Sequence, residues 1–355
     1  MPTDQNKAMD LRQTEVSLAL EASPAISAAQ GSIQDHGAQL SDADRCSSER
    51  LAPVSAIIPT KNRPDDLRRT VRTLLAQTLL PREVVIVDQS GDDQSYRAVQ
   101  EEFAECRRTL GVAPELKYVH DPAISGVSAA RNRSMTCADQ ATWLFLDDDV
   151  VMEPEFIAEM MGAYEVDPTV DGVSGVITNY VPMPFMHRLW MTVFARGPFC
   201  EKRLAIYWHA DKLRDRGVFR VAGFSGGLMS FRREIASRGL FDTRVGDGED
   251  VDFCLNLGQD KKFVISPRMR LQHLSSPVER SRKEPLWIER YAVTQSFLYH
   301  KHWRGVLKNA ICYAWLCVGL GVATSGSAVR RSSTGPWRAL IAGLRSGKQT
   351  AQRRN

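Results

Sequence analysis

The chain has 355 residues, 43% of them hydrophobic, which is enough to bury one large core or two modest ones. Its 46 basic and 42 acidic residues leave a formal net charge of +4, which is too balanced for a protein whose affinity rests on nucleic-acid phosphates. The seven cysteines form no CxxC pair, so we expect reduced thiols in a cytosolic compartment and no structural disulfide.

The first 50 residues are rich in Gln, Ser, Ala and Asp and have no sustained apolar period. Such a segment cannot offset the entropy lost on ordering, so we predict a flexible tail. The stretch 1–20 contains acidic residues and lacks the continuous apolar core of a secretory signal, which argues against export. A folded cytoplasmic domain is therefore expected to begin near residue 51.

Strands and helices are predicted to alternate from residue 54 to residue 146. The apolar run 54–59 ends at Pro59 and predicts a buried strand, and the apolar period that follows Pro64 predicts a helix. The other predicted strands cover 83–87, 116–119 and 142–146, and the other predicted helices lie near 92–106 and 125–138. This alternation predicts an α/β fold with a mostly parallel central sheet that is flanked by helices.

Polar residues follow several of these strands, at the edge of the sheet where α/β proteins bind ligands. The triplet Asp147-Asp148-Asp149 comes directly after the strand 142–146. Three adjacent carboxylates repel one another in a low dielectric, and a bound divalent cation relieves that repulsion. In an extended chain, 147 and 149 face one way while 148 faces the other. The alternative is a helix N-cap cluster, because Glu153 and Glu155 indicate that a helix begins soon afterwards.

A second acidic pair, Glu249-Asp250, follows flexible glycines at the start of a predicted helix. A carboxylate positioned there can take a proton from an acceptor hydroxyl, although the helix dipole also favours acidic residues at a helix start. The next predicted strand, 263–265, leads toward His273. Its neutral imidazole can bind the same cation as the Asp triplet, or it can be purely structural.

Together these motifs resemble family 2 of the glycosyltransferases, whose members have the GT-A fold. The resemblance covers residues from about 54 to 275 and rests on six segments in the family's order and approximate spacing: IIPTKNR (57–63), VVIVD (84–88), GVSAARNR (126–133), DDD (147–149), GGLMSFRR (226–233) and ED (249–250). It implies a GT-A domain at 51–280, with a nucleotide-sugar-binding half at 51–150 and an acceptor half at 151–280. A helical, membrane-associated region is then expected at 281–355.

The resemblance also implies a nucleotide diphosphate sugar as the donor. Pro59, Thr60, Arg63 and Asp88 match residues that line the family's nucleoside site, where Asp88 would accept a hydrogen bond from the base. Arg131 matches a residue that supports this site or the diphosphate. Lys61 stands where some relatives have an aromatic residue that stacks on the base, so the donor nucleotide stays open.

The Asp triplet matches the family's DxD element, which works with Mg²⁺ or Mn²⁺. By this match Asp149 binds the metal, while Asp147 and Asp148 bind ribose or metal. His273 matches a metal-binding histidine that some relatives place after the next strand. The nearby Ser225-Gly226-Gly227 departs from the Cys-Asn or Ala-Asn of many members, so acceptor contacts in that segment stay open.

In similar enzymes one carboxylate of the ED pair is the catalytic base, and we favour Asp250 over Glu249. A base that deprotonates the acceptor hydroxyl on the face opposite the leaving group implies a single displacement with inversion at the anomeric carbon. No covalent sugar intermediate is then needed. The rival enzyme, a sugar-nucleotide nucleotidyltransferase, lacks its Gly-rich phosphate loop, because 59–66 contains no glycine. A non-catalytic binding module would keep several site carboxylates with no reaction to serve.

Two segments suggest contacts outside this core. The stretch 179–222 is rich in aromatic residues and prolines, which suit sugar stacking, a membrane interface or ordinary packing. The stretch 309–329 has no charged residue and is long enough to cross a bilayer, but its glycines, serines and threonines favour a helix lying on the surface over a span or an internal helix. Trp337, Leu340, Ile341 and Leu344, with basic neighbours, predict a second lipid contact. We therefore expect a peripheral enzyme on the cytoplasmic face of the membrane, with a saccharide or lipid-linked acceptor and no nucleic-acid partner.

Overall fold

The computed structural model describes residues 50–200, 206–207, 209–258, 260–275 and 287–353. The predicted flexible tail over 1–50 lies outside the described residues apart from residue 50. The strands are β1 (Leu51–Thr60), β2 (Leu80–Asp88), β3 (Glu115–His120), β4 (Thr142–Leu146), β5 (Val150–Met152), β6 (Gly172–Ile177), β7 (Phe219–Val221), β8 (Leu228–Arg232) and β9 (Phe263–His273). The α-helices are α2 (Pro64–Leu75), α3 (Gln94–Leu110), α4 (Val127–Met135), α5 (Phe156–Val166), α6 (Phe185–Phe194), α8 (Arg233–Ala236), α9 (Glu249–Leu257), α10 (Trp287–Leu298), α11 (Leu307–Arg331) and α12 (Gly335–Gln352).

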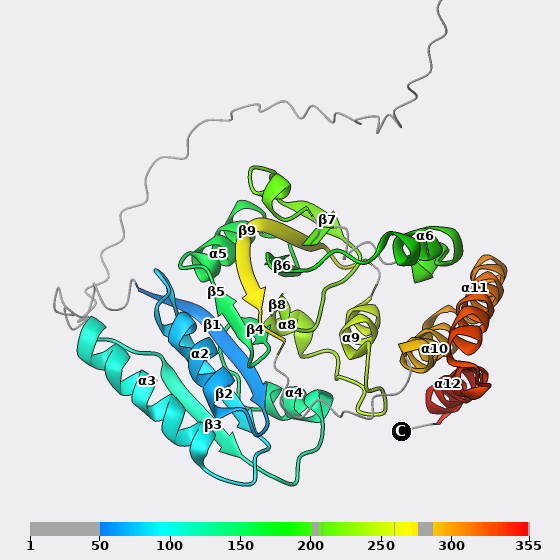
Figure 1. Cartoon of the computed structure of the whole chain (residues 1–355). Helices are drawn as coiled ribbons and strands as arrows, with labels where there is room; N and C mark the ends of the chain where they lie inside the picture. The colour runs from blue at the N-terminus through cyan, green and yellow to red at the C-terminus, as the bar shows by residue number, and fades with distance from the viewer. Residues whose placement is uncertain (1–49, 201–205, 208, 259, 276–286, 354–355) are drawn as a thin grey trace, which may run out of the picture. The chain divides into compact units, whose positions relative to one another are not determined.

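The strands form one mixed sheet in the order β3-β2-β1-β4-β8-β6-β9-β5, with β7 paired to β9 (Figure 1). Strands β3, β2, β1 and β4 run parallel to one another, as the alternation of strands and helices predicts. Beyond β4 the sheet is mixed, because β8 runs antiparallel to both β4 and β6 while β6 and β9 are parallel. The parallel half aligns the carboxyl ends of β1, β2 and β4 at one edge.

Helices cover both faces of the sheet, which confirms the predicted α/β class. On one face, Leu67 of α2, Phe103 of α3 and Phe156 of α5 pack on alternate strand residues such as Ile58 and Ile86. On the other face, strand residues such as Ile57, Val85 and Phe145 meet α4, α8 and α9. Alternate residues of the strands thus contribute to the apolar clusters on the two faces of the sheet. The polar residues at the strand ends lie outside these clusters, where they can form a binding site.

A third apolar cluster joins α10, α11 and α12 to the segment around α9. Leu316, Leu320 and Leu340 are buried in it, and Leu255 of α9 packs against it. The predicted lipid contact of Leu340 is therefore wrong, because this side chain belongs to the core, whereas Leu344 is partly buried against the cluster and Trp337 and Ile341 are exposed.

Two local predictions differ from the structure near the polar segments. The chain after the Asp triplet enters the short strand β5, and α5 begins only at Phe156 with no side-chain cap bond at Glu155. The alternative interpretation of the triplet as a helix N-cap cluster is therefore wrong. The predicted strand 263–265 is the beginning of β9, which continues to His273 and pairs with both β6 and β5. Both differences result from the pairing of β5 and β6 with β9, and local periodicity in the sequence does not report strand pairing.

Candidate active site

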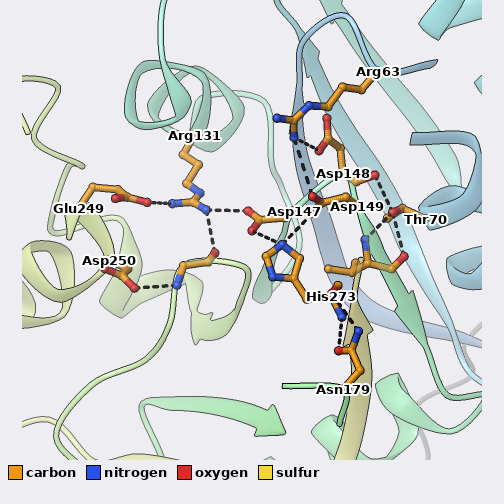
Figure 2. Close-up of polar contacts among 12 residues, drawn as sticks. Arg63, Thr70, Arg131, Asp147, Asp148, Asp149, Asn179, Glu249, Asp250 and His273 are labelled. Carbon is orange, nitrogen blue, oxygen red and sulfur yellow. Dashed lines mark hydrogen bonds and ion pairs between the residues drawn. The ribbon is translucent and has the colours of Figure 1, made fainter. Parts of the chain in front are cut away.

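Asp149 and His273 are brought together by the pairing of β5 with the end of β9. Val150 pairs with His273 in this antiparallel ladder, and the Leu274 amide donates to the Asp149 carbonyl over 2.8 Å. His273 Nε2 then lies 2.9 Å from Asp149 Oδ1 and 3.8 Å from Asp147 Oδ2 (Figure 2). One ligand atom from each of these three residues lies within 4.8 Å of the others. Two carboxylates and an imidazole so placed are a donor set that suits a divalent cation such as Mn²⁺ or Mg²⁺.

Residues 148 and 149 form a turn between β4 and β5, so the predicted alternation of an extended chain does not apply to them. The Arg63 guanidinium lies 3.0 Å from Asp148 Oδ1 and 4.0 Å from Asp149 Oδ2. The Asp148 carboxylate accepts hydrogen bonds from Thr60 Oγ1 (2.7 Å) and from the Arg63 guanidinium (3.0 Å). The Thr70 hydroxyl donates to the Asp148 carbonyl at 2.8 Å and so ties the triplet to α2. Burial raises the pKa of Asp148 to about 6, against the opposing effects of Thr60 and Arg63. Asp148 therefore links the end of β1 to the end of β4, while the Asp147 and Asp149 carboxylates lie near His273.

Arg131 of α4 connects the two acidic segments. Its guanidinium donates to Glu249 Oε1 (2.9 Å), to Asp147 Oδ1 (3.1 Å) and to the Gly226 carbonyl (2.7 Å), as Figure 2 shows. The Arg131 side chain is only 1% exposed, so water cannot solvate its positive charge. The hydrogen bonds to protein groups stabilise that charge instead. A buried arginine bonded in this way holds Asp147, Glu249 and the 225–227 segment in one arrangement.

The Glu249-Asp250 pair opens α9, as predicted, after Gly248 in the left-handed conformation. Asp250 Oδ2 accepts the Gly226 amide hydrogen bond at 2.8 Å, and its Oδ1 accepts that of Val251 at 2.7 Å. These two amides orient the carboxylate. Burial raises the pKa of Glu249, while the positive charge of Arg131 opposes the rise. The pair therefore stands at the start of a helix, and Glu249 also lines a cavity at this edge of the sheet.

A cavity of about 780 Å³ lies at this edge of the sheet. The predicted site residues that line it are Pro59, Thr60, Arg63, Arg131, Asp147, Asp148, Asp149, Glu249 and His273. Among the described lining residues, Asp88 and Asp250 are absent. Asp88 is fully buried and accepts hydrogen bonds from Ser90 and the Tyr118 hydroxyl, whereas its neighbour Gln89 lines the cavity. The Gln89 amide oxygen has no hydrogen-bond partner among the described residues, which leaves it available to a ligand.

Several site residues were not predicted from the sequence. Asn179, just after β6, exchanges two hydrogen bonds of 3.0 Å with the backbone of His273. Asp247 lines the cavity and accepts a bidentate ion pair from Arg290 of α10 at 2.7 and 2.9 Å, and Thr294 donates to its carbonyl. The position of Asn179 after a buried strand was the available signal for it. The sequence contained no signal for Arg290 and Thr294. They lie on a helix that was predicted to associate with a membrane, and they contact Asp247 only in the folded chain.

Gly227 is required by its close approach to Asp147. A Cβ at position 227 would lie 2.5 Å from Asp147 Oδ2, which real structures do not tolerate. We expect Gly227→Ala to displace this carboxylate and to lower sugar transfer by about tenfold to a hundredfold, since a shift near 1 Å has effects of that size. Steady-state kinetics would measure it. The matched control is Gly217→Ala, where a Cβ meets nothing within 4 Å, and comparable loss in both variants would contradict the assignment.

Comparison with known sequences finds a family and distant relatives. Residues 55–239 match the family model described as "Glycosyl transferase family 2", which is just over half of the chain. A glucosyl-dolichyl phosphate glucuronosyltransferase of Haloferax volcanii is 27% identical over 236 residues, covering 62% of this chain and 68% of that protein. A validoxylamine A glucosyltransferase of Streptomyces hygroscopicus is 29% identical over 141 residues, covering 38% of this chain but only 30% of that protein.

Solved structures share the fold. The mannosyltransferase PcManGT from Pyrobaculum calidifontis, in complex with GDP-Man and Mn²⁺, aligns with a TM-score of 0.52 at 19% identity, covering 84% of this chain and 86% of its own. TarS 1–349 of S. aureus, in complex with UDP-GlcNAc, aligns with a TM-score of 0.55 at 16% identity, covering 84% and 81%. At such identities the likeness concerns the fold alone, whereas the family match concerns the sequence. The chain belongs to glycosyl transferase family 2 and is a glycosyltransferase with the GT-A fold.

Proposed function

We propose that this enzyme transfers a sugar, with inversion, from a nucleotide diphosphate sugar to a saccharide or lipid-linked acceptor, and that it needs Mg²⁺ or Mn²⁺. The observation that carries the proposal is the convergence of Asp147 and Asp149, from the connection between β4 and β5, with His273, from the end of β9, in the lining of one cavity. Arg131 and His273 offset part of the repulsion between these carboxylates, and a bound cation would offset more of it.

The residues fit such an ion by their chemistry. Two carboxylate oxygens and one imidazole nitrogen leave coordination positions for diphosphate oxygens, as in a site that binds metal and substrate together. When bound, the cation neutralises the charge that develops on the departing nucleotide diphosphate. PcManGT, which shares the fold, holds Mn²⁺ together with its nucleotide sugar, which supports the same pairing here.

The donor nucleotide is assigned to the part of the cavity lined by the end of β1. Arg63 is 20% exposed and pairs with Asp148, so its guanidinium stays near the cavity and can meet a phosphate or ribose oxygen. Gln89 offers a buried amide oxygen to a nucleobase N–H group in the place where Asp88 was predicted to act. The contact between Asp88 and the base stays a prediction, since the buried carboxylate would have to exchange its Tyr118 partner for the ligand.

Asp250 is our candidate for the base that takes the acceptor proton. Its carboxylate is oriented by the backbone amides of Gly226 and Val251, at the start of the helix that follows Gly246 and Gly248. The acceptor oxygen then attacks the anomeric carbon as the bond to the diphosphate breaks, and the proton passes to the carboxylate. This single displacement inverts the configuration.

A lipid-linked acceptor at the cytoplasmic face of a membrane is the acceptor class we favour. The Haloferax relative acts, by its name, on a glucosyl-dolichyl phosphate. In the described part of this chain one helix, α11, is long and apolar enough to cross a membrane. Both observations support a reaction at the bilayer surface.

A thermal-shift screen tests the donor and the metal together. A ligand that binds only the native state raises stability by about 2.7 kcal/mol at a hundred times its Kd, so we expect one nucleotide diphosphate to raise the Tm by several degrees. The shift should appear with Mn²⁺ or Mg²⁺ and disappear with a chelator. If no nucleotide diphosphate stabilised the protein in the presence of either ion, the proposal would be wrong. Nucleotide release from the matching sugar donor then measures transfer.

A further inference from the structure

The long helix α11 has one exposed apolar side. Six of its apolar side chains are between 45% and 78% exposed, and they recur at intervals of three, four or seven residues: Leu307, Ile311, Trp315, Val318, Val322 and Val329. This spacing places them on one side of a helix. Leu316 and Leu320 on the other side are fully buried in the cluster formed with α10 and α12. The helix is therefore one-sided, with apolar surface left uncovered along its length.

Helix α6 lies against α11 and extends this surface. The Trp190 indole donates to the Gly319 carbonyl at 2.8 Å, and the Trp315 indole donates to the Val193 carbonyl at 2.9 Å. The rings of Phe194 and Trp315 are 5.3 Å apart. Trp315 thus belongs to the exposed side of α11 and also contacts α6, so the two helices border one another at that side.

The exposed side chains of α6 are large and apolar. Phe185, Met186 and Leu189 are 72%, 69% and 45% exposed and share one side of the helix. We call these three residues and the six of α11 the α6–α11 face. Exposed apolar side chains gathered in this number indicate an interaction surface.

The charge of the chain around the α6–α11 face indicates what kind of partner this surface binds. Residues 290–355 contain eleven basic and no acidic residues, whereas the first 289 residues contain 35 basic and 42 acidic ones. The segment 172–200, which includes α6, likewise has no acidic residue and carries Arg188 and Arg196. Lys308, Arg330 and Arg331 are exposed at the two ends of α11. Exposed apolar side chains with basic residues at both ends of the helix complement a bilayer surface that contains anionic lipid.

We propose that the α6–α11 face docks on an anionic membrane surface, with α11 lying along the bilayer and α6 inserted beside it. A spanning α11 would have to exchange its packed side for lipid, including the contacts of Leu316, Leu320 and the buried Thr324. The exposed tryptophan at the junction of the two helices suits the headgroup level of a bilayer. The docking surface thus includes α6, which lies more than 100 residues before α11.

This placement bears on the acceptor. Phe185 begins α6 six residues after Asn179, which holds the backbone of His273 by two hydrogen bonds. Six residues span at most about 20 Å, so docking by α6 keeps the bilayer surface within that reach of the β6 end of the site. The consequence for a lipid-linked acceptor rests on the proposed function, whereas the docking itself does not.

Co-sedimentation of the full chain with vesicles tests the proposal. Vesicles that contain phosphatidylglycerol should bind the protein, vesicles of phosphatidylcholine alone should bind it much more weakly, and added salt should weaken the binding. Ile311→Asp in α11 and Phe185→Asp in α6 should each weaken it about tenfold or more, because each removes apolar contact and adds repulsion. Leu240→Asp is the matched control, since Leu240 is 66% exposed but lies outside the face. Circular dichroism checks that each variant is folded.

Other outcomes would overturn the proposal. Loss of binding in Ile311→Asp with full binding in Phe185→Asp would restrict docking to the C-terminal helices. Absence of vesicle binding, together with a dimer that these two variants dissociate in analytical ultracentrifugation, would assign the face to a second copy of the chain. Asp149→Asn separates docking from catalysis: it should bind vesicles as the unaltered protein does while losing transfer, so failure of the catalytic proposal leaves this test intact.

Discussion

Asp149→Asn is expected to lower the rate of sugar transfer at least about a hundredfold and to abolish the Mn²⁺-dependent rise in Tm with nucleotide. The Asp149 carboxylate is 2% exposed and lies 2.9 Å from His273 Nε2, at the centre of the candidate metal site. An amide has the same shape but no negative charge, so a cation loses a ligand without a cavity being created. Nucleotide release kinetics and thermal shift measure the two effects.

The fold should tolerate this substitution, since it removes one of three neighbouring buried or half-buried carboxylates and therefore part of their repulsion. We expect the Tm of the metal-free protein not to fall. Asp93→Asn is the control, because Asp93 is 56% exposed and pairs with Arg97 on α3, away from the cavity lining. Retention of Mn²⁺-dependent nucleotide binding by Asp149→Asn would exclude Asp149 from the metal site.

The second large effect is expected at the acidic pair. Asp250→Asn should lower kcat by about a hundredfold to ten-thousandfold, the range that general-base catalysis contributes, while donor binding with Mn²⁺ is kept. The amide keeps the size of the side chain and can still accept from the Gly226 amide, so the 225–227 segment should hold its position. Steady-state kinetics with acceptor and thermal shift with donor separate the two properties.

Glu249→Gln, compared with Asp250→Asn, shows which of the two carboxylates acts as the base. Glu249 pairs with the buried Arg131, so its neutralisation weakens an ion pair that organises Asp147 and the Gly226 carbonyl. We expect reduced stability and weaker donor binding with a smaller loss of kcat. Near-normal transfer by Asp250→Asn with none by Glu249→Gln would assign the base to Glu249, which lines the cavity. The configuration of the product, determined by NMR, tests inversion independently of either variant.

The C-terminal helices also hold the segment that carries this acidic pair. Arg290 binds Asp247 two residues before Glu249, and Lys301 and His302 bind the fully buried Asp252 at 2.8 and 2.7 Å. Lys301 and His302 lie in a five-residue π-helix, Tyr299–Trp303, between α10 and α11. Such irregular helical turns are frequent at functional sites. A region predicted as a membrane attachment therefore also positions α9.

The sequence by itself determined the features that depend on local pattern. Short apolar runs predicted β1, β2 and β4, the apolar period of α2 predicted its buried side, and the Asp triplet followed a strand as expected. The order and spacing of the motifs, read as a resemblance, indicated the family and the GT-A fold. The alternation expected of an extended chain did not hold for the triplet, because residues 148 and 149 form a turn that places both carboxylates near Arg63.

Only the tertiary structure decided which of these groups meet. The pairing of β5 with the end of β9 sets His273 beside Asp149 across more than 120 residues, and no local pattern encodes the register of strands so far apart. Arg131 lies between Asp147 and Glu249 only because folding brings α4 close to the start of α9. The α6–α11 face likewise forms only when these two helices meet in the folded chain. Local sequence sets the conformation and the polarity of each element, whereas long-range packing and hydrogen bonding bring the charges together.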